Sequence, residues 1–95
     1  MKYIVFWEFC PDDTDKVIAK QMKMTEEREK EADKYPKYLF PPQWTGQCKG
    51  FSIVEVADPK QFRNSNIFWF PEMKLKFVPC DDVSEWIALY MKQKK

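Results

Sequence analysis

Glu8 is the only carboxylate within residues 2–9 (KYIVFWEF), a segment of β-branched and aromatic side chains. A carboxyl group that faces a dry cavity has a raised pKa and can act as a general acid or base. On a strand, the same side chain can instead form a cross-strand ion pair, and Lys74 or Lys76 is the expected partner. We favour the ion pair over catalysis or simple exposure, and Glu8 remains the candidate catalytic residue.

Aromatic residues make up 17% of the chain and suggest a second kind of site. Small-molecule pockets favour aromatic walls, which would suit a flat, apolar ligand. The candidate ligand-binding residues are Tyr3, Trp7, Trp44 and Trp69. Filling the core and the seam between two copies is the commoner use of aromatic side chains in a small sheet protein. Both interpretations stay open.

The chain contains no histidine, which excludes much chemistry. A Ser-His-Asp triad, a His-activated cysteine, and zinc or haem sites with a histidine ligand cannot form within it. Two glycines, Gly46 and Gly50, cannot supply a phosphate-binding loop. Asp12, Asp13 and Asp15 cluster where a helix is expected to begin, and capping explains them. We therefore expect no cofactor and no metal site.

Charge and cysteine content restrict the partners. A net charge of +1 argues against nucleic acid, and no apolar stretch approaches the ~20 residues that span a bilayer. Cys10, Cys48 and Cys80 form no CxxC motif, so neither a disulfide framework nor a zinc motif is indicated. This cysteine usage favours a reducing, cytoplasmic setting. Whether Cys10 and Cys48, at one end of the expected sheet, form a redox pair is open.

The element pattern predicts one α+β domain over residues 1–95. Strand patterns cover residues 2–9, 51–57 and 73–79, and helical patterns cover 13–34, 59–65 and a final segment after Asp82. Residues 37–40 favour a further strand, but Pro41-Pro42 excludes a central position, and a regular strand over 37–45 is open. The order βαββαβ plus a C-terminal helix predicts a ferredoxin-like, four-stranded antiparallel sheet with helices on one face.

The first strand is apolar on both faces, and the helices can cover only one. Tyr3, Val5, Trp7 and Phe9 alternate with Ile4, Phe6 and Cys10. A second sheet is the simplest cover for the remaining face, so we expect a homodimer packed through the open face of the sheet.

Three motifs resemble an uncharacterised family of short prokaryotic proteins in the dimeric α/β-barrel superfamily. They are the K-Y-x-V opening strand, Gly50-Phe51-x-x-Val54-Glu55 followed by Asp58-Pro59, and the strand ending in Val78-Pro79. The resemblance implies the fold and the dimer. The superfamily includes cofactor-free monooxygenases, isomerases, haem-dependent enzymes and proteins with no known reaction, so it implies little about chemistry.

Two main hypotheses for function follow. In the first, a homodimeric binding or accessory protein holds a small apolar or aromatic molecule in an aromatic-lined cavity. In the second, a cofactor-independent enzyme of monooxygenase or isomerase type acts on an aromatic or quinone-like compound. Trp7, Trp44 and Trp69 would then position the substrate, and Glu8 would transfer the proton. A purely structural partner of another protein is a third, less favoured interpretation.

Overall fold

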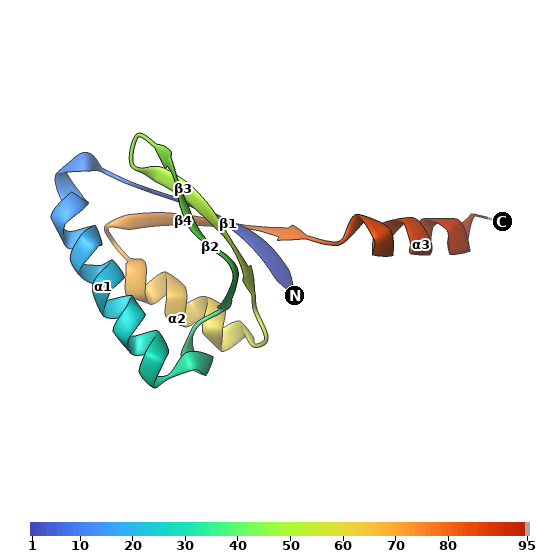
Figure 1. Ribbon diagram of the computed structural model, residues 1–95, viewed down its shortest axis with the longest axis horizontal. Helices are drawn as coiled ribbons and strands as arrows, with labels where there is room; N and C mark the ends of the chain where they lie inside the picture. Colours follow the sequence, from blue (N-terminus) through green and yellow to red (C-terminus); the bar gives the residue numbers. More distant parts are fainter. Residues whose placement is uncertain (95) are drawn as a thin grey trace.

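The computed structural model describes residues 1–94 (Figure 1). One antiparallel sheet contains the strands β1 (Lys2–Phe9), β2 (Lys37–Gly46), β3 (Lys49–Glu55) and β4 (Met73–Cys80). The helices are α1 (Thr14–Lys30), α2 (Pro59–Trp69) and α3 (Val83–Gln93), with short 3-10 turns η1 (Pro11–Asp13) and η2 (Ala32–Lys34). The strand order β2-β3-β1-β4 confirms the expected α+β fold, whose topology matches the ferredoxin-like plan.

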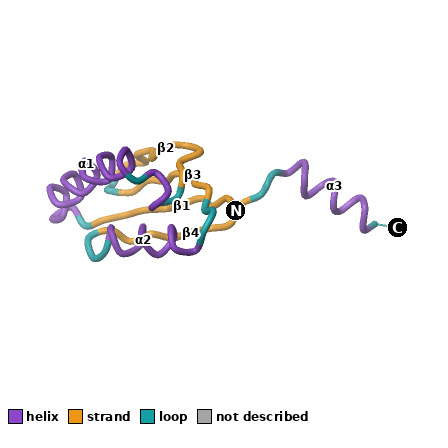
Figure 2. Tube along the Cα trace, turned by 90° about the horizontal axis from the view of Figure 1, so that it is seen from below, coloured by secondary structure: helices purple, strands orange, loops and turns teal. Residues whose placement is uncertain are grey.

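The core lies between the sheet and the two helices α1 and α2, which cover one of its faces (Figures 1 and 2). Alternation along β1 sends Val5, Trp7 and Phe9 toward the helices, as expected from the sequence. The buried apolar side chains are Val5, Val17, Met24, Tyr35, Val54 and Trp69. Burial of each such side chain stabilises the fold by roughly 1.5–3 kcal/mol.

The first helix is shorter than the expected 13–34. It ends at Lys30, because Glu31 leaves the helical region with φ −137° and ψ 72°, and η2 follows. This break lets Tyr35, only 2% exposed, enter the core. Asp12 lies in η1 and does not cap α1; at that end the Thr14 hydroxyl donates to the Pro11 carbonyl oxygen at 2.6 Å.

The strands β2 and β3 and the helix α2 have boundaries that differ from the expected ones. Strand β2 continues through Pro41-Pro42, which is tolerated because β2 is an edge strand with irregular register there. Strand β3 occupies 49–55 rather than 51–57. Helix α2 begins at the expected Asp58 cap, whose Oδ1 accepts from the Lys60 N–H at 2.8 Å, but it runs to Trp69.

Helix α3 stands away from the rest of the molecule (Figures 1 and 2). Its large apolar side chains are all exposed, namely Val83, Trp86, Ile87, Leu89, Tyr90 and Met91. At its base, Lys2 Nζ pairs with Asp82 Oδ1 at 2.5 Å. Over the described residues, no helix is both long and apolar enough to cross a membrane.

Candidate functional site

A cavity of about 370 Å³ separates α1 and α2 from the sheet. Residues of all four strands line it, together with residues of both helices. Its walls are mainly apolar: Val5 comes from β1, Val17 from α1, Val54 from β3 and Leu75 from β4. A concave, mostly apolar space of this size is typical of small-molecule sites.

Three of the four candidate ligand-binding residues line this cavity: Trp7 on β1, Trp44 on β2 and Trp69 at the end of α2. The ring centroids of Trp7 and Trp44 lie 6.0 Å apart, with the planes tilted by 46°. Trp69 is 6% exposed, whereas Trp44 is 62% exposed. Trp69 therefore belongs to the buried wall, and Trp44 forms part of the rim.

The two indoles of Trp7 and Trp44 meet because Gly50 lies between them. The register places Gly50 of β3 opposite Trp7 on one side and Trp44 on the other. A Cβ atom on Gly50 would lie 2.1 Å from Trp7 Cζ2 and 2.1 Å from the Gln43 carbonyl oxygen. Because Gly50 has no side chain, the Trp7 ring can pack directly against the sheet at this position.

A small number of polar side chains interrupt the apolar lining, among them Gln21, Arg28, Ser52 and Ser65. Trp7 Nε1 and Arg28 Nε are buried, and neither has a hydrogen-bond partner among the described residues. Buried donors of this kind are rare in native structures.

Arg28 is held in place at the C-terminal end of α1. Its Nη1 donates to the Pro36 carbonyl oxygen at 2.6 Å. Its guanidinium carbon lies 4.0 Å from the ring centroid of Tyr38 and 5.6 Å from that of Tyr35. Stacking on aromatic faces suits a guanidinium, and it fixes the orientation of the charge.

Next to this end of the cavity, Glu27 accepts hydrogen bonds from Tyr35 Oη at 3.0 Å and from Lys34 Nζ at 3.2 Å. Burial opposes the charged form of Glu27, but these two donors outweigh it and hold its pKa below the usual value. Burial, and then the hydrogen bond to Glu27, raises the pKa of Tyr35. Glu27 is thus occupied by its own partners.

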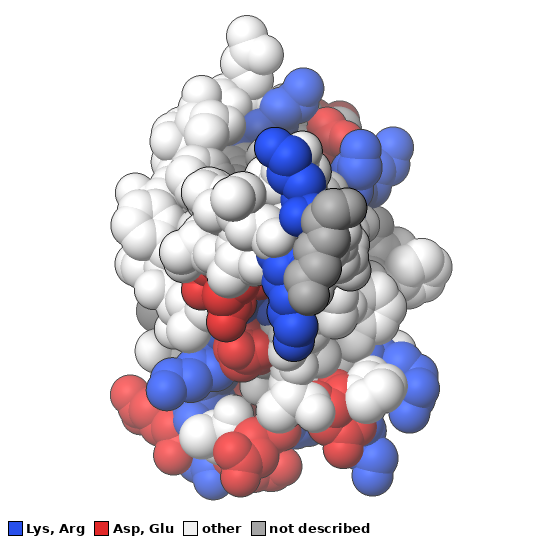
Figure 3. Space-filling view, turned by 90° about the vertical axis from the view of Figure 1, so that its right-hand side faces the viewer, with Lys and Arg blue, Asp and Glu red and all other residues white. Residues whose placement is uncertain are grey.

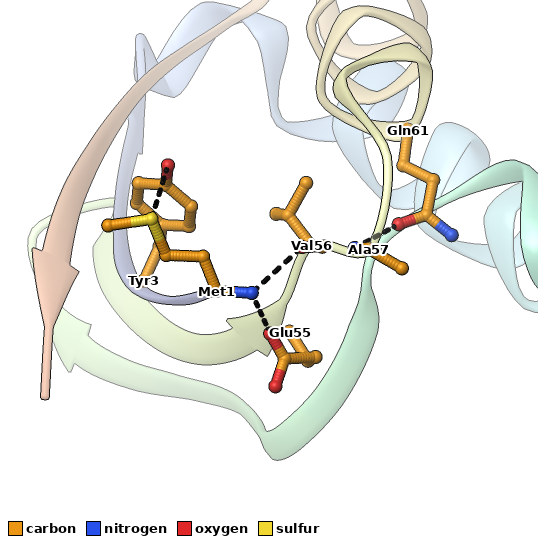
Figure 4. A network of polar contacts seen from close by, with 6 residues as sticks. All are labelled: Met1, Tyr3, Glu55, Val56, Ala57 and Gln61. Carbon is orange, nitrogen blue, oxygen red and sulfur yellow. Dashed lines mark hydrogen bonds and ion pairs between the residues drawn. The ribbon is translucent and has the colours of Figure 1, made fainter. Parts of the chain in front are cut away.

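Tyr3 lies apart from the three tryptophans. It is near the other end of β1, where its hydroxyl lies 3.7 Å from Met1 Sδ (Figure 4). There the Met1 ammonium group contacts the Glu55 carboxylate and the Val56 carbonyl oxygen. Tyr3 lines a separate hollow with Phe62, which is 39% exposed.

Glu8 lies on the opposite face of the sheet from Trp7 and outside the cavity. Its register partner on β4 is Lys74, as the sequence suggested, but the ion pair forms with Lys49 of β3, 4.0 Å away. Both side chains of that pair are more than half exposed. The structure therefore does not bring Glu8 together with the tryptophans.

The thiols lie at two ends of the sheet. Cys48 lies just after the end of β2, and its carbonyl oxygen accepts a hydrogen bond from the Phe9 N–H at 3.0 Å. Cys10 and Cys48 therefore lie at the same end of the sheet. Cys80 lies opposite Lys2 at the other end. All three are free thiols. Among the described residues, no group of three or more acidic or cysteine side chains is placed to hold a metal ion.

Sequence reasoning missed Arg28 and Gln21. Both occur in a helix whose second half is nearly all charged, and such a run is typical of a solvated surface. The spacing in the sequence could have revealed these two residues. Successive members of the set Val17, Gln21, Met24 and Arg28 are three or four positions apart, so they lie on one face of the helix. Val17 and Met24 are buried and Arg28 is half-buried, whereas Gln21 borders the cavity from an exposed position.

Comparison with known proteins gives one match. The model of the family described as Domain of unknown function (DUF3303) matches residues 1–94. No curated protein and no solved structure matches the chain.

Proposed function

We propose that this chain, which belongs to the family Domain of unknown function (DUF3303), is a homodimeric protein that binds a small, flat, apolar molecule. The cavity between the sheet and the helices carries the proposal, with its volume of about 370 Å³ and its three tryptophans. Drug-sized ligands occupy cavities of roughly 300–1,000 Å³ with mostly apolar walls and few polar groups.

Binding is favoured over catalysis by what lines the cavity. Its described lining residues include neither an Asp or Glu nor a Cys. The enzymatic alternative used Glu8 as the proton-transfer group, and that carboxylate lies across the sheet from the cavity. General acid-base chemistry needs such a group within hydrogen-bond reach of the substrate.

The open face of the sheet supports the homodimer. In its middle, Ile4 of β1 lies between Ile53 of β3 and Val78 of β4. Next to them, Phe6 is 47% exposed, and Phe51 stacks on the outward Phe40 with ring centroids 6.0 Å apart. An apolar patch of this kind, beside Lys76 and Glu8 on the same face, favours an interaction surface, and a second copy presents the same patch.

Helix α3 offers a second apolar surface to the same partner. Seen from the α3 side, a broad uncharged area lies beside the lysines, and charged side chains gather lower down (Figure 3). Isolated helices shorter than ~12–15 residues are marginal in water, and α3 has 11 residues. Contact with a second copy would supply the burial that this helix lacks in one chain.

Native mass spectrometry of the purified protein tests the assembly and the ligand together. We expect a mass near twice 11.5 kDa, with an excess that belongs to a bound small molecule. A bare monomer would contradict both parts of the proposal.

A matched pair of serine variants tests whether the cavity is the site. Ser65 is buried on α2 and lines the cavity, whereas Ser84 lies on α3. Ser65→Leu should fill the cavity and weaken binding of a neutral biphenyl carboxamide by about tenfold or more, in isothermal titration calorimetry. Ser84→Leu should bind as the wild type does. Equal affinity of the Ser65→Leu protein and the wild type would overturn the assignment of the site.

A further inference from the structure

Two residues that line the cavity each carry a buried hydrogen-bond donor with no acceptor within the described chain. Trp7 Nε1 and Arg28 Nε are both fully buried and unpartnered, and both residues line the cavity. A buried donor without an acceptor retains the cost of losing its water, which an acceptor from outside the chain would offset. Trp7 Nε1 has no exposed surface and its ring lies against Gly50, whereas the Arg28 guanidinium carries further N–H donors besides Nε.

The Arg28 guanidinium also lacks a counter-charge. No carboxylate of the described residues lies within ion-pair distance of it, and neighbouring Glu27 is engaged by Lys34 and Tyr35. The contacts of Arg28 with Pro36 and Tyr38 orient the group but leave its charge unneutralised. In an apolar wall, such a group favours a carboxylate or a similar anion, with which it forms charge-assisted hydrogen bonds.

The two donors lie at opposite ends of the cavity. Trp7 and Trp44 share one row of the sheet across Gly50, whereas Tyr38, on which Arg28 stacks, shares its row with Val54 and Tyr3. Tyr3 and Trp7 are separated by four positions along β1, or about 13 Å at the rise of a β-strand. The space between the two rows is lined by apolar side chains.

We infer that the ligand is an elongated, flat, apolar acid. Its anionic group pairs with Arg28, and its apolar body lies between the sheet and α1 and reaches the rings of Trp7 and Trp44. This inference rests on the proposed function and specifies the chemical class of the ligand. A neutral hydrocarbon would leave the Arg28 charge unpaired, and a free inorganic anion would leave the apolar walls unfilled.

A pair of probes that differ only in charge tests the inference. A hydroxylated biphenyl carboxylate and the corresponding biphenyl carboxamide have nearly the same shape, and calorimetry gives the affinity of each. We expect the wild type to bind the carboxylate about tenfold or more tightly than the carboxamide, as a charge-assisted bond predicts. Arg28→Met should remove this preference, and Arg28→Lys should retain part of it.

Arg63 provides the matched control, because it is exposed on α2 and is absent from the cavity lining. Arg63→Met should keep the preference for the carboxylate. If Arg28→Met fails to fold, the ratio of the wild type's affinities for the carboxylate and the carboxamide still tests the inference. Equal wild-type affinities for the two probes, both weakened by Ser65→Leu, would overturn this inference and leave the proposed function standing. Carboxylate binding that Ser65→Leu leaves unchanged would overturn both.

Discussion

The indole of Trp7 occupies the space that a side chain on Gly50 would fill. A Cβ atom at that position would lie 2.1 Å from Trp7 Cζ2, far inside van der Waals contact. The obstacle on the other side is the backbone oxygen of Gln43, which cannot rotate away. One missing side chain thus positions the aromatic end of the cavity.

Gly50→Ala should therefore destabilise the protein and displace Trp7. We expect a loss of about 1–3 kcal/mol in the free energy of unfolding, the usual cost of overpacking. Gly46→Ala is the control, because nothing lies within 4 Å of its added Cβ and only its φ of +94° opposes the substitution. Urea unfolding followed by circular dichroism measures both. The prediction fails if Gly50→Ala retains wild-type stability and wild-type binding of the biphenyl carboxamide.

Glu27 should make the stability of the fold dependent on acid pH. Its pKa in the folded protein is below the usual 4.5, because the hydrogen bonds from Tyr35 and Lys34 outweigh burial. A lowered carboxyl pKa stabilises the folded state above about pH 4.5, and this contribution is lost as the pH falls through the folded-state pKa.

Urea unfolding at a series of pH values measures this contribution. The difference in stability between the wild type and Glu27→Gln should be full at neutral pH and should shrink as the pH falls. Glu26→Gln, at an exposed neighbouring position, should show no such convergence. Parallel curves for the wild type and Glu27→Gln would contradict the prediction.

Phe6→Glu should dissociate the proposed homodimer. The new carboxylate would lie on the open face of the sheet, between Phe51 and Lys76, where the partner would have to bury it. Ile67→Glu introduces the same charge at a 73% exposed position on α2 and should leave the assembly intact. Sedimentation velocity distinguishes the two masses. A Phe6→Glu protein that remains dimeric would place the interface elsewhere.

Removing α3 should weaken the proposed homodimer without unfolding the rest. A chain that ends at Asp82 keeps the ion pair with Lys2 and the whole core. We expect its dimer dissociation constant to rise, measured by sedimentation equilibrium. In the full chain, helix content measured by circular dichroism should increase with protein concentration, since α3 is too short to be stable alone. Helix content independent of concentration, with an unchanged dissociation constant, would exclude α3 from the interface.

Glu8→Gln should change little. The carboxylate is half exposed and lies 4.0 Å from Lys49 Nζ, so the expected loss of stability is below about 1 kcal/mol. Glu72→Gln should cost more, because Glu72 is 15% exposed and lies 2.5 Å from Lys20 Nζ. Binding of the biphenyl carboxamide to the Glu8→Gln protein should equal that of the wild type. A loss of binding would return Glu8 to the candidate site.

The sequence predicted the sheet well because alternation along a strand depends on local pattern. The two faces of β1 and the Asp58 cap followed from residue type and spacing. The length of β2 did not, since Pro41-Pro42 are compatible with a strand only at a sheet edge with irregular register. Whether such a segment forms a strand depends on its pairing with a strand elsewhere in the chain.

The candidate site was predicted in part, for a related reason. Aromatic residues on the helix-facing side of a strand are expected near a core, so Trp7 was found. Arg28 was not, because a charged residue in a charged run normally lies in solvent. Its inward orientation depends on Pro36 and Tyr38, which come from the chain after the helix break at Glu31. The Lys49 partner of Glu8 likewise depends on register.

The positions of the tryptophans divide the protein's intrinsic fluorescence into two sources. Trp7, Trp44 and Trp69 line the cavity, whereas Trp86 lies on α3, stacked on Tyr90 with ring centroids 5.3 Å apart. A Trp86→Phe protein would therefore emit only from the cavity walls. The difference between its spectrum and that of the wild type would report the surroundings of α3, so the emission spectra of the two proteins can follow ligand binding and helix docking separately.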